Sequence, residues 1–212
     1  MMFTSHFADA ERISSQSELT ARFGTDCITL APGGSLVLSG TIVIGSEVAF
    51  AGACTFGDGT SIGAGSQLTD TILGAGNRVR PYSIMTDVTA GDNNLLGPFC
   101  FIRDKCVVGD DCIIGAHVEA ARSSFGSGAK ISHRAFIGDA RVGARVIIGA
   151  GAVFCNWDGQ AHQQSLVGND TIIGSGSLIV PPIQLGENVV IAAGSTVTKD
   201  VPAGAKIIQK RA

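Results

Sequence analysis

His133 holds the position in this sequence that best suits acid–base chemistry. It stands two residues after Ile131, in a chain where an aliphatic or aromatic residue recurs every six positions. If three six-residue units make one coil, the outward position of His133 recurs at Ala150, Ser175 and Ala193. Neighbouring strands lie about 4.8 Å apart, so this column spans roughly 14 Å. Its small residues leave room for an extended pantetheine arm, and a histidine at one end could take a proton from an attacking amine or hydroxyl. On the column alone, a surface histidine on a smooth wall is the favoured interpretation.

The six-residue period predicts the element that would hold this column. Two runs show it clearly: Ile44, Phe50, Phe56 and Ile62, and then Val167, Ile173, Ile179, Leu185, Ile191 and Val197. A period of six is neither the 3.6 of a helix nor the 2 of an open strand, but it fits a short strand plus a turn. Three such units close a triangular coil, and stacked coils bury the repeating residues. The sequence therefore predicts an all-β fold, a parallel β-helix of hexapeptide repeats.

A second buried register lies four residues after each member of the period, and its residues are small or β-branched. Four of the six cysteines occupy it, namely Cys54, Cys100, Cys106 and Cys112. No C-x-x-C motif occurs, and a chain of this length does not need disulfides to stabilise its core. We interpret these cysteines as small buried residues rather than metal ligands or nucleophiles.

The ends of the period and one interruption in it divide the chain. Residues 1–27 are expected to form a cap with a short helix, because Ser15 and Glu18 have capping-box spacing and Gly24 is a suitable stop. The β-helix is expected over residues 28–201 and a tail over 202–212. The step from Phe154 to Val167 is seven residues longer than one unit. Residues 155–166 should therefore project as a loop, and loops on rigid scaffolds often carry function.

Composition excludes several function classes. The 212 residues include 29 glycines and carry a formal charge of −3. This charge gives no electrostatic basis for binding nucleic acid or an anionic membrane. No apolar run approaches the roughly 20 residues of a membrane span, and the first residues do not resemble a signal peptide. We expect a cytoplasmic protein.

Several motifs resemble one known family. They are Ser83 to Asp87, Gly97-Pro98-Phe99, Val118-Glu119, Ser132 to Ala140, and Ile148 to Gly151 leading into Cys155-Asn156-Trp157-Asp158-Gly159. From about Ile28 to Lys210 the sequence resembles the C-terminal acetyltransferase domain of the bacterial bifunctional enzyme that makes UDP-N-acetylglucosamine from glucosamine-1-phosphate. Hexapeptide solenoids of this kind coil left-handed, so the resemblance implies a left-handed β-helix. No glycine-rich segment ending in Pro-Lys precedes the repeats, so we expect no uridylyltransferase activity.

The resemblance also implies roles for individual residues. The catalytic base falls on His133. The acetyl-CoA contacts fall on Ala150, Asn156, Trp157, Ser175, Ala193 and Lys210. On the acceptor side Arg103 and Asn156 match the family, Phe136 replaces its Tyr and His162 replaces a Lys. Ala121 stands where the family has a phosphate-binding Lys, and Ile147 where it has an Asn. Arg122 is a further candidate for holding a phosphate.

These residues predict an acetyl-CoA-dependent N-acetyltransferase. Its expected acceptor is an amino sugar phosphate, either glucosamine-1-phosphate or a related amino sugar or nucleotide sugar. The resembling family forms trimers with sites between subunits, so a homotrimer is expected. The alternative is a non-catalytic trimeric scaffold or regulatory protein of the same fold. Some related solenoids bind zinc through three histidines, but His117 and His133 are off column from one another, and we expect no metal.

Overall fold

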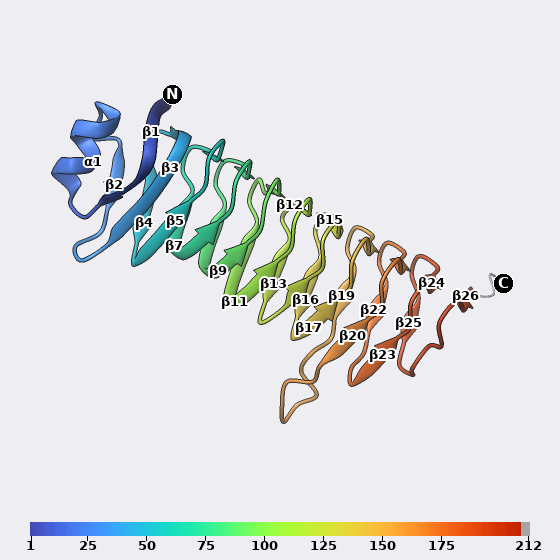
Figure 1. Ribbon diagram of the computed structural model, residues 1–212. Helices are drawn as coiled ribbons and strands as arrows, with labels where there is room; N and C mark the ends of the chain where they lie inside the picture. Colours follow the sequence, from blue (N-terminus) through green and yellow to red (C-terminus); the bar gives the residue numbers. More distant parts are fainter. Residues whose placement is uncertain (209–212) are drawn as a thin grey trace.

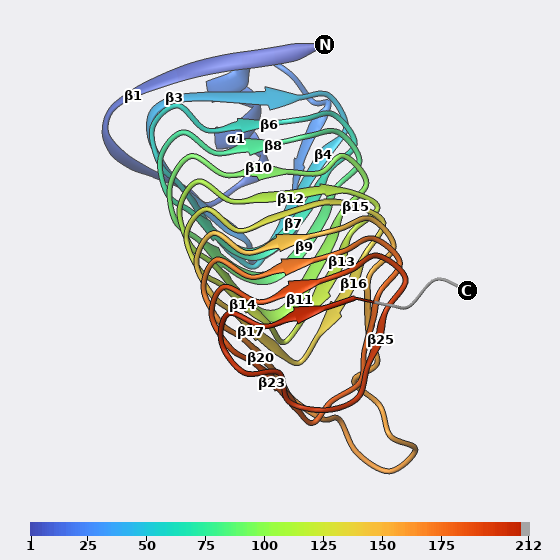
Figure 2. The same cartoon turned by 90° about the vertical axis from the view of Figure 1, so that its right-hand side faces the viewer.

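The computed structural model describes residues 1–208, and over this range the chain winds into a parallel β-solenoid with a single helix. Figure 1 shows the coils stacked in sequence order from the capped N-terminal end to the C-terminus. Each coil is triangular, with three sheet faces and three corners between them (Figure 2). The β-helix expected from the six-residue period is confirmed.

Short strands make up each face, and four longer strands bend from one face to the next. The first face contains β6 (Ser61–Ile62), β8 (Arg78–Val79), β10 (Leu95–Leu96), β12 (Ile113–Ala116), β15 (Lys130–His133), β18 (Ile147–Ile148), β21 (Ile172–Ile173), β24 (Val190–Ile191) and β26 (Lys206–Ile207). The second face contains β2 (Ile28–Leu30), β4 (Val48–Ala51), β13 (Glu119–Ala121), β16 (Phe136–Gly138), β19 (Val153–Phe154), β22 (Leu178–Ile179) and β25 (Thr196–Val197). The third contains β5 (Ala53–Phe56), β14 (Ser124–Phe125), β17 (Ala140–Val142), β20 (Ser165–Val167) and β23 (Ile183–Leu185).

The bent strands carry the chain from one face to the next. β3 (Ser35–Gly45) runs from the third face onto the first, and β7 (Gln67–Leu73), β9 (Ile84–Ala90) and β11 (Phe101–Val108) run from the second onto the third. We call the corner between the first and second faces the first corner, and the one between the second and third faces the second corner.

The period-six residues lie inside the prism, one above another. On the first face the parallel pairing aligns Ile114, Ile131, Ile148, Ile173 and Ile191 in consecutive coils. All five are at most 3% exposed. The four cysteines of the second register are buried as well, and burial raises the pKa of the Cys54 and Cys100 thiols to about 11. Those thiols therefore stay protonated at neutral pH, as expected of packing residues.

A strand and a helix close the N-terminal end. Helix α1 (Gln16–Phe23) begins at the N-cap Ser15, whose hydroxyl accepts from the backbone N–H of Glu18, and ends at Gly24 in the left-handed conformation. The preceding strand β1 (Met2–Ile13) was not predicted. It pairs antiparallel with β3 and lies across the end of the solenoid (Figure 2). Its side chains are mostly exposed, so its sequence carries no clear alternation of apolar and polar residues.

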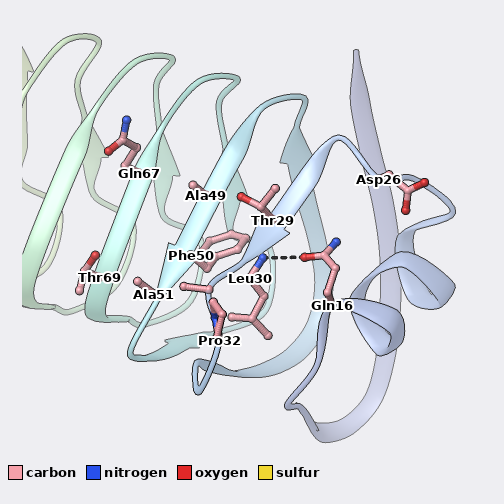
Figure 3. Close-up of a pocket in the computed structure, with 11 residues that line it drawn as sticks. Gln16, Asp26, Thr29, Leu30, Pro32, Ala49, Phe50, Ala51, Gln67 and Thr69 are labelled. Atoms are coloured by element: carbon pink, nitrogen blue, oxygen red, sulfur yellow. Dashed lines mark hydrogen bonds between the residues drawn. The ribbon is translucent and has the colours of Figure 1, made fainter.

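The side chain of Gln16 covers the edge of the first coil. Its amide oxygen accepts from the backbone N–H of Leu30 at 2.8 Å, the bond drawn in Figure 3, and its amide nitrogen donates to the carbonyl of Ile28 at 2.9 Å. The amide therefore satisfies an otherwise open strand edge. Beside it lies a hollow of about 590 Å³ over Ala49 and Ala51. This hollow is at the opposite end of the chain from the projecting loop.

The other expected boundaries can be compared with the described residues. β26 adds a further rung within the segment expected to be a tail, because its residues pair in parallel with β24. Residues 155–164 leave the solenoid between β19 and β20 and form the projecting loop visible in Figure 1. In residues 1–208 no helix is long and apolar enough to cross a membrane.

A pair of neighbouring isoleucines tests whether the buried stack stabilises the fold. Ile173 is fully buried and Ile172, next to it on β21, is 42% exposed. Ile173→Ala leaves a cavity between coils and should lower the free energy of unfolding by about 2–5 kcal/mol. Ile172→Ala should change it by about 0.5 kcal/mol or less. Urea denaturation measures both, and equal losses would show that the interior stack is not what stabilises the coil.

Candidate active site

The first corner carries the column predicted from the spacing. The pairing of Ile131, Ile148, Ile173 and Ile191 puts the residues two positions further along in register with one another. Backbone hydrogen bonds join the same corner in consecutive coils: Gly151 N–H to the His133 carbonyl at 3.4 Å, Gly176 N–H to that of Ala150 at 2.8 Å, and Gly194 N–H to that of Ser175 at 2.8 Å. His133, Ala150, Ser175 and Ala193 therefore form one exposed column, as the sequence predicted.

The residue that follows each column position changes from an aromatic ring to glycine across Arg134, the exposed residue that follows His133. On the N-terminal side these corner residues are Tyr82, Phe99 and His117, whose rings stack with centroids 5.5 and 5.1 Å apart. On the C-terminal side they are Gly151, Gly176 and Gly194. All six have the left-handed backbone conformation, with φ between 56° and 73°. The corner therefore accepts side chains, and glycine is not required by the backbone alone.

The glycines make the C-terminal half of the corner bare. A Cβ atom added at Gly176 or Gly194 would have nothing within 4 Å, so a larger residue would project into solvent. Together with Ala150, Ser175 and Ala193, these glycines leave a strip without long side chains next to His133. A strip of this kind can hold an extended ligand against the backbone.

His133 itself is exposed at the end of β15, and within residues 1–208 its imidazole has no hydrogen-bond partner. Its ring nitrogens are therefore available to a ligand. Below it, toward the N-terminus, His133 and Ser132 line a hollow of about 310 Å³ on the first face. The strip without long side chains and this hollow meet at His133.

Asp139 organises the second corner. Its carboxylate accepts hydrogen bonds from the Arg122 guanidinium at 2.7 and 3.0 Å and from Asn156 Nδ2 at 2.5 Å, and His162 Nδ1 lies 3.3 Å away. The Arg122 guanidinium, helped by the Asn156 amide, lowers the pKa of Asp139 from its ordinary value. Asn156 is 6% exposed and lies over Gly138, where a Cβ would come within 2.4 Å of its amide nitrogen.

Contacts within the projecting loop hold its tip in one shape. Asp158 Oδ1 accepts from the backbone N–H groups of Gln160 and Ala161 at 2.8 Å each, and these bonds lower the pKa of Asp158. The backbones of Trp157 and His162 form an isolated antiparallel β-bridge. Their rings meet edge to face, with the ring centroids 5.1 Å apart. Trp157 is 55% exposed and so presents an aromatic surface to solvent.

The two acceptor-side arginines, Arg103 on the second face and Arg122 at the second corner, are already paired. Arg103 bonds Glu119 at 2.8 and 3.2 Å and also contacts Asp104. Arg122 reaches the same Asp104 at 3.0 Å. Ala121, between Arg103 and Gly138 in the register, is fully buried. Both arginines are thus neutralised by carboxylates of their own chain.

The structure brings the candidate residues together in two groups. His133, Ala150, Ser175 and Ala193 share the first corner, whereas Arg122, Asn156, Trp157 and His162 share the second corner and its loop. Arg103 and Phe136 lie on the second face between them, and Ile147 is exposed on the first face. Lys210 lies outside the described residues. Within residues 1–208 no three His, Cys, Asp or Glu side chains are grouped as a metal site.

Asp139 was missed as a functional candidate, although a signal for it exists. It follows Arg122 by seventeen residues and precedes Asn156 by seventeen, which is one coil in each direction at this corner. Residues one coil apart stack directly, so an acid between an arginine and an asparagine predicts this hub.

Replacing Asp139 should release the loop. Asp139→Ala removes the shared acceptor of Arg122, Asn156 and His162, so we expect faster amide exchange over residues 156–163 and altered emission from Trp157, the single tryptophan. Because the folded-state pKa of Asp139 is lowered, the attachment should be complete above the ordinary aspartate pKa and lost as pH falls through the lowered value. Asp170→Ala is the control, since Asp170 pairs with Arg145 at 2.7 Å away from the loop. Equal exchange in both variants would contradict this role.

Comparison with known proteins agrees with these features. Residues 90–121 and 165–199 match the family described as Bacterial transferase hexapeptide (six repeats). The bifunctional protein GlmU of Burkholderia thailandensis is 34% identical over 210 residues, covering 96% of this chain and 46% of that protein. GlmU of a Synechococcus strain is 40% identical over 164 residues, covering 77% and 36%. The chain thus spans less than half the length of the relatives it matches.

Solved structures confirm the fold. LpxA from Acinetobacter baumannii superimposes with a TM-score of 0.57 at 17% identity, covering 84% of this chain and 68% of that one. LpxA from Bacteroides fragilis gives 0.51 at 16% identity with the same coverage. The left-handed β-helix implied by the family resemblance is confirmed. The chain is therefore a hexapeptide-repeat protein, homologous over most of its own length to part of the bifunctional GlmU proteins.

Proposed function

We propose that this protein is an acetyl-CoA-dependent N-acetyltransferase acting on an amino sugar or a nucleotide-linked amino sugar. The observation that carries the proposal is the change at His133, where a corner of stacked rings becomes a corner of glycine, alanine and serine. The bare strip extends over three coil steps, about 14 Å, from His133 to Ala193. That length suits the pantetheine arm of acetyl-CoA. The similarity to GlmU proteins supports the same assignment.

In the proposed reaction the acceptor amine attacks the thioester carbonyl of acetyl-CoA. His133 takes the proton that the amine loses, and the carbon–sulfur bond then breaks. The proton passes from His133 to the departing CoA thiolate, so that CoA leaves as the thiol. Backbone N–H groups near the Asn156 loop are proposed to stabilise the negative oxygen of the tetrahedral intermediate. No metal is needed for this transfer.

The two groups of site residues support assembly into a homotrimer. His133 and the Asn156 loop lie at different corners of one prism, with the width of the second face between them. A loop that projects from one chain can cover the strip of a neighbour, so we propose that each site is completed between subunits. Ala150, Ser175 and Ala193 would then contact the donor. Asn156, Trp157 and Lys210 would contribute from neighbouring chains, and Arg103, Arg122, Phe136 and His162 would face the acceptor.

We also propose a cytoplasmic location, which the cysteines and the proposed donor support. All six cysteines are free, as is usual in a reducing compartment, and acetyl-CoA is the proposed donor.

A thermal shift with millimolar acetyl-CoA separates the transferase from a scaffold of the same fold. Stabilisation supports donor binding, and none would favour the scaffold.

Mutation of His133 tests its role as the base. Proton transfer by a positioned side chain contributes about 10²- to 10⁴-fold, so His133→Ala should lower kcat by that factor while the Kd for acetyl-CoA stays nearly constant. His6→Ala on β1 is the control and should leave kcat unchanged. Turnover of His133→Ala within about threefold of the natural protein would remove His133 from the mechanism.

The mass of the particle tests the assembly. Three chains of 21.6 kDa give a homotrimer of about 65 kDa. We expect light scattering to return this mass at the concentration used for assays. A monomer that acetylates amines at full rate would contradict a site shared between chains.

The acceptor side predicts weak use of glucosamine-1-phosphate. Ala121 cannot bind a phosphate, and Arg103 and Arg122 are held by carboxylates. A hydrogen bond to a charged group contributes about 1.5–3 kcal/mol, so its loss should weaken binding about 10- to 150-fold relative to a family member with the lysine. Donor affinity should stay normal. Steady-state kinetics with both substrates measures this, and a family-like KM for glucosamine-1-phosphate would show that these positions do not contact the acceptor.

A further inference from the structure

The hollow on the first face next to His133 has an arginine at its far end. Its lining includes Arg80 at one end, Gly97 and Gly115 between the ends, and Ser132 and His133 at the other end. Val79, Leu96, Ile114 and Ile131 lie in consecutive coils, so Arg80 and His133 are three coil steps, about 14 Å, apart along the axis. The volume of about 310 Å³ is at the lower end of the range for small-molecule sites.

Arg80 differs from the arginines of the second face in its electrostatic surroundings. Arg103 and Arg122 share three carboxylates, those of Asp104, Glu119 and Asp139. Arg80 is exposed, forms no ion pair within residues 1–208, and no carboxylate lines its hollow. Among the residues that line the hollow, Arg80 is the only arginine, and no carboxylate of the lining neutralises it. A guanidinium can bind a phosphate through two parallel N–H donors.

The floor between the two ends is shallow because Gly97 and Gly115 occupy, in the two middle coils, the register position that Arg80 and Ser132 hold in the outer ones. A Cβ at Gly115 would lie 2.0 Å from the Ser132 carbonyl oxygen, so close coil packing requires glycine there. Leu95 and Ile113 add an apolar surface beside it. The stacked rings of Tyr82, Phe99 and His117 follow the same corner and give the hollow a rigid neighbour.

We propose that this hollow binds the acceptor, with the amine at His133 and a phosphate group of the acceptor at Arg80. The inference rests on the proposed role of His133 as the base. The separation of the two ends, even after the reach of the arginine side chain, exceeds that between an amine and a phosphate on neighbouring sugar carbons. The substrate class is therefore an amino sugar whose phosphate or nucleoside diphosphate lies across the ring from the amine.

Kinetics with matched acceptors test this assignment. The probes are glucosamine-6-phosphate against glucosamine, and a nucleoside-diphosphate-linked 4-aminohexose against the free 4-aminohexose. Arg80→Ala should raise KM for the phosphorylated member of a pair about 10- to 150-fold and change KM for its unphosphorylated partner and for acetyl-CoA by less than about threefold. Arg80→Lys should raise KM for the phosphorylated acceptor less than Arg80→Ala does, because lysine keeps the positive charge but lacks the paired N–H donors of the guanidinium.

Arg78→Ala is the control, since Arg78 is exposed on the same strand, β8, but does not line the hollow. Equal KM increases for both members of a pair, or the same loss in Arg78→Ala, would overturn the proposal. Which pair responds more strongly distinguishes a sugar phosphate from a nucleotide sugar.

Calorimetry separates this inference from the proposed function. Phosphorylated acceptors titrated into the protein without acetyl-CoA report binding whether or not transfer occurs. Binding that Arg80→Ala weakens tenfold or more, without turnover, would support the hollow and contradict the transferase. Turnover with an acceptor affinity that Arg80→Ala leaves unchanged would support the transferase and overturn the hollow.

Discussion

The hydrogen bonds between successive coils are the constraint on which the rest of this structure depends. Each parallel strand pairs with the equivalent strand one coil away. Each corner therefore stacks on the same corner of the next coil. Alignment of the buried isoleucines fixes this register, because a slip of one residue would expose the whole stack. Residues sixteen or more positions apart in the sequence are thereby placed on neighbouring strands, which lie about 4.8 Å apart.

The proposed site differs from the rest of the solenoid only in the side chains at otherwise equivalent corners. The same left-handed corner position holds a ring at Phe99 and His117 and no side chain at Gly176. The coil tolerates both, so the choice reflects what lies outside the prism. At the second corner the same stacking joins Arg122, Asp139 and Asn156, and attaches a loop that the coil itself does not need. One repeat thus provides a strip, a hollow and an anchored loop.

Much of the fold and of the candidate site was predictable, because in a repeat the sequence spacing determines where each residue lies. The column through His133 and Ala193, the buried cysteines and the projecting loop all follow from the six-residue period. Asp139 was within reach of the same reasoning, but its role depends on three side chains turning toward one carboxylate. β1 could not be predicted, because only Phe7 and Ile13 of its twelve residues are buried. The pairing of Arg103 with Glu119, and the freedom of Arg80, depend on side-chain directions that spacing does not determine.

The central claim is that each site combines the His133 strip of one chain with the Asn156 loop of another. Co-expression of His133→Ala and Asn156→Ala chains, purified together through two different tags, tests it most directly. Each variant alone should be inactive. In a mixed trimer one site of the three would pair an intact His133 with an intact Asn156, whichever variant is in excess. The tag-selected mixture should therefore recover roughly a third of the activity of the natural protein. Mixed trimers as inactive as the single variants would contradict the account, because the two residues would then have to act from the same chain.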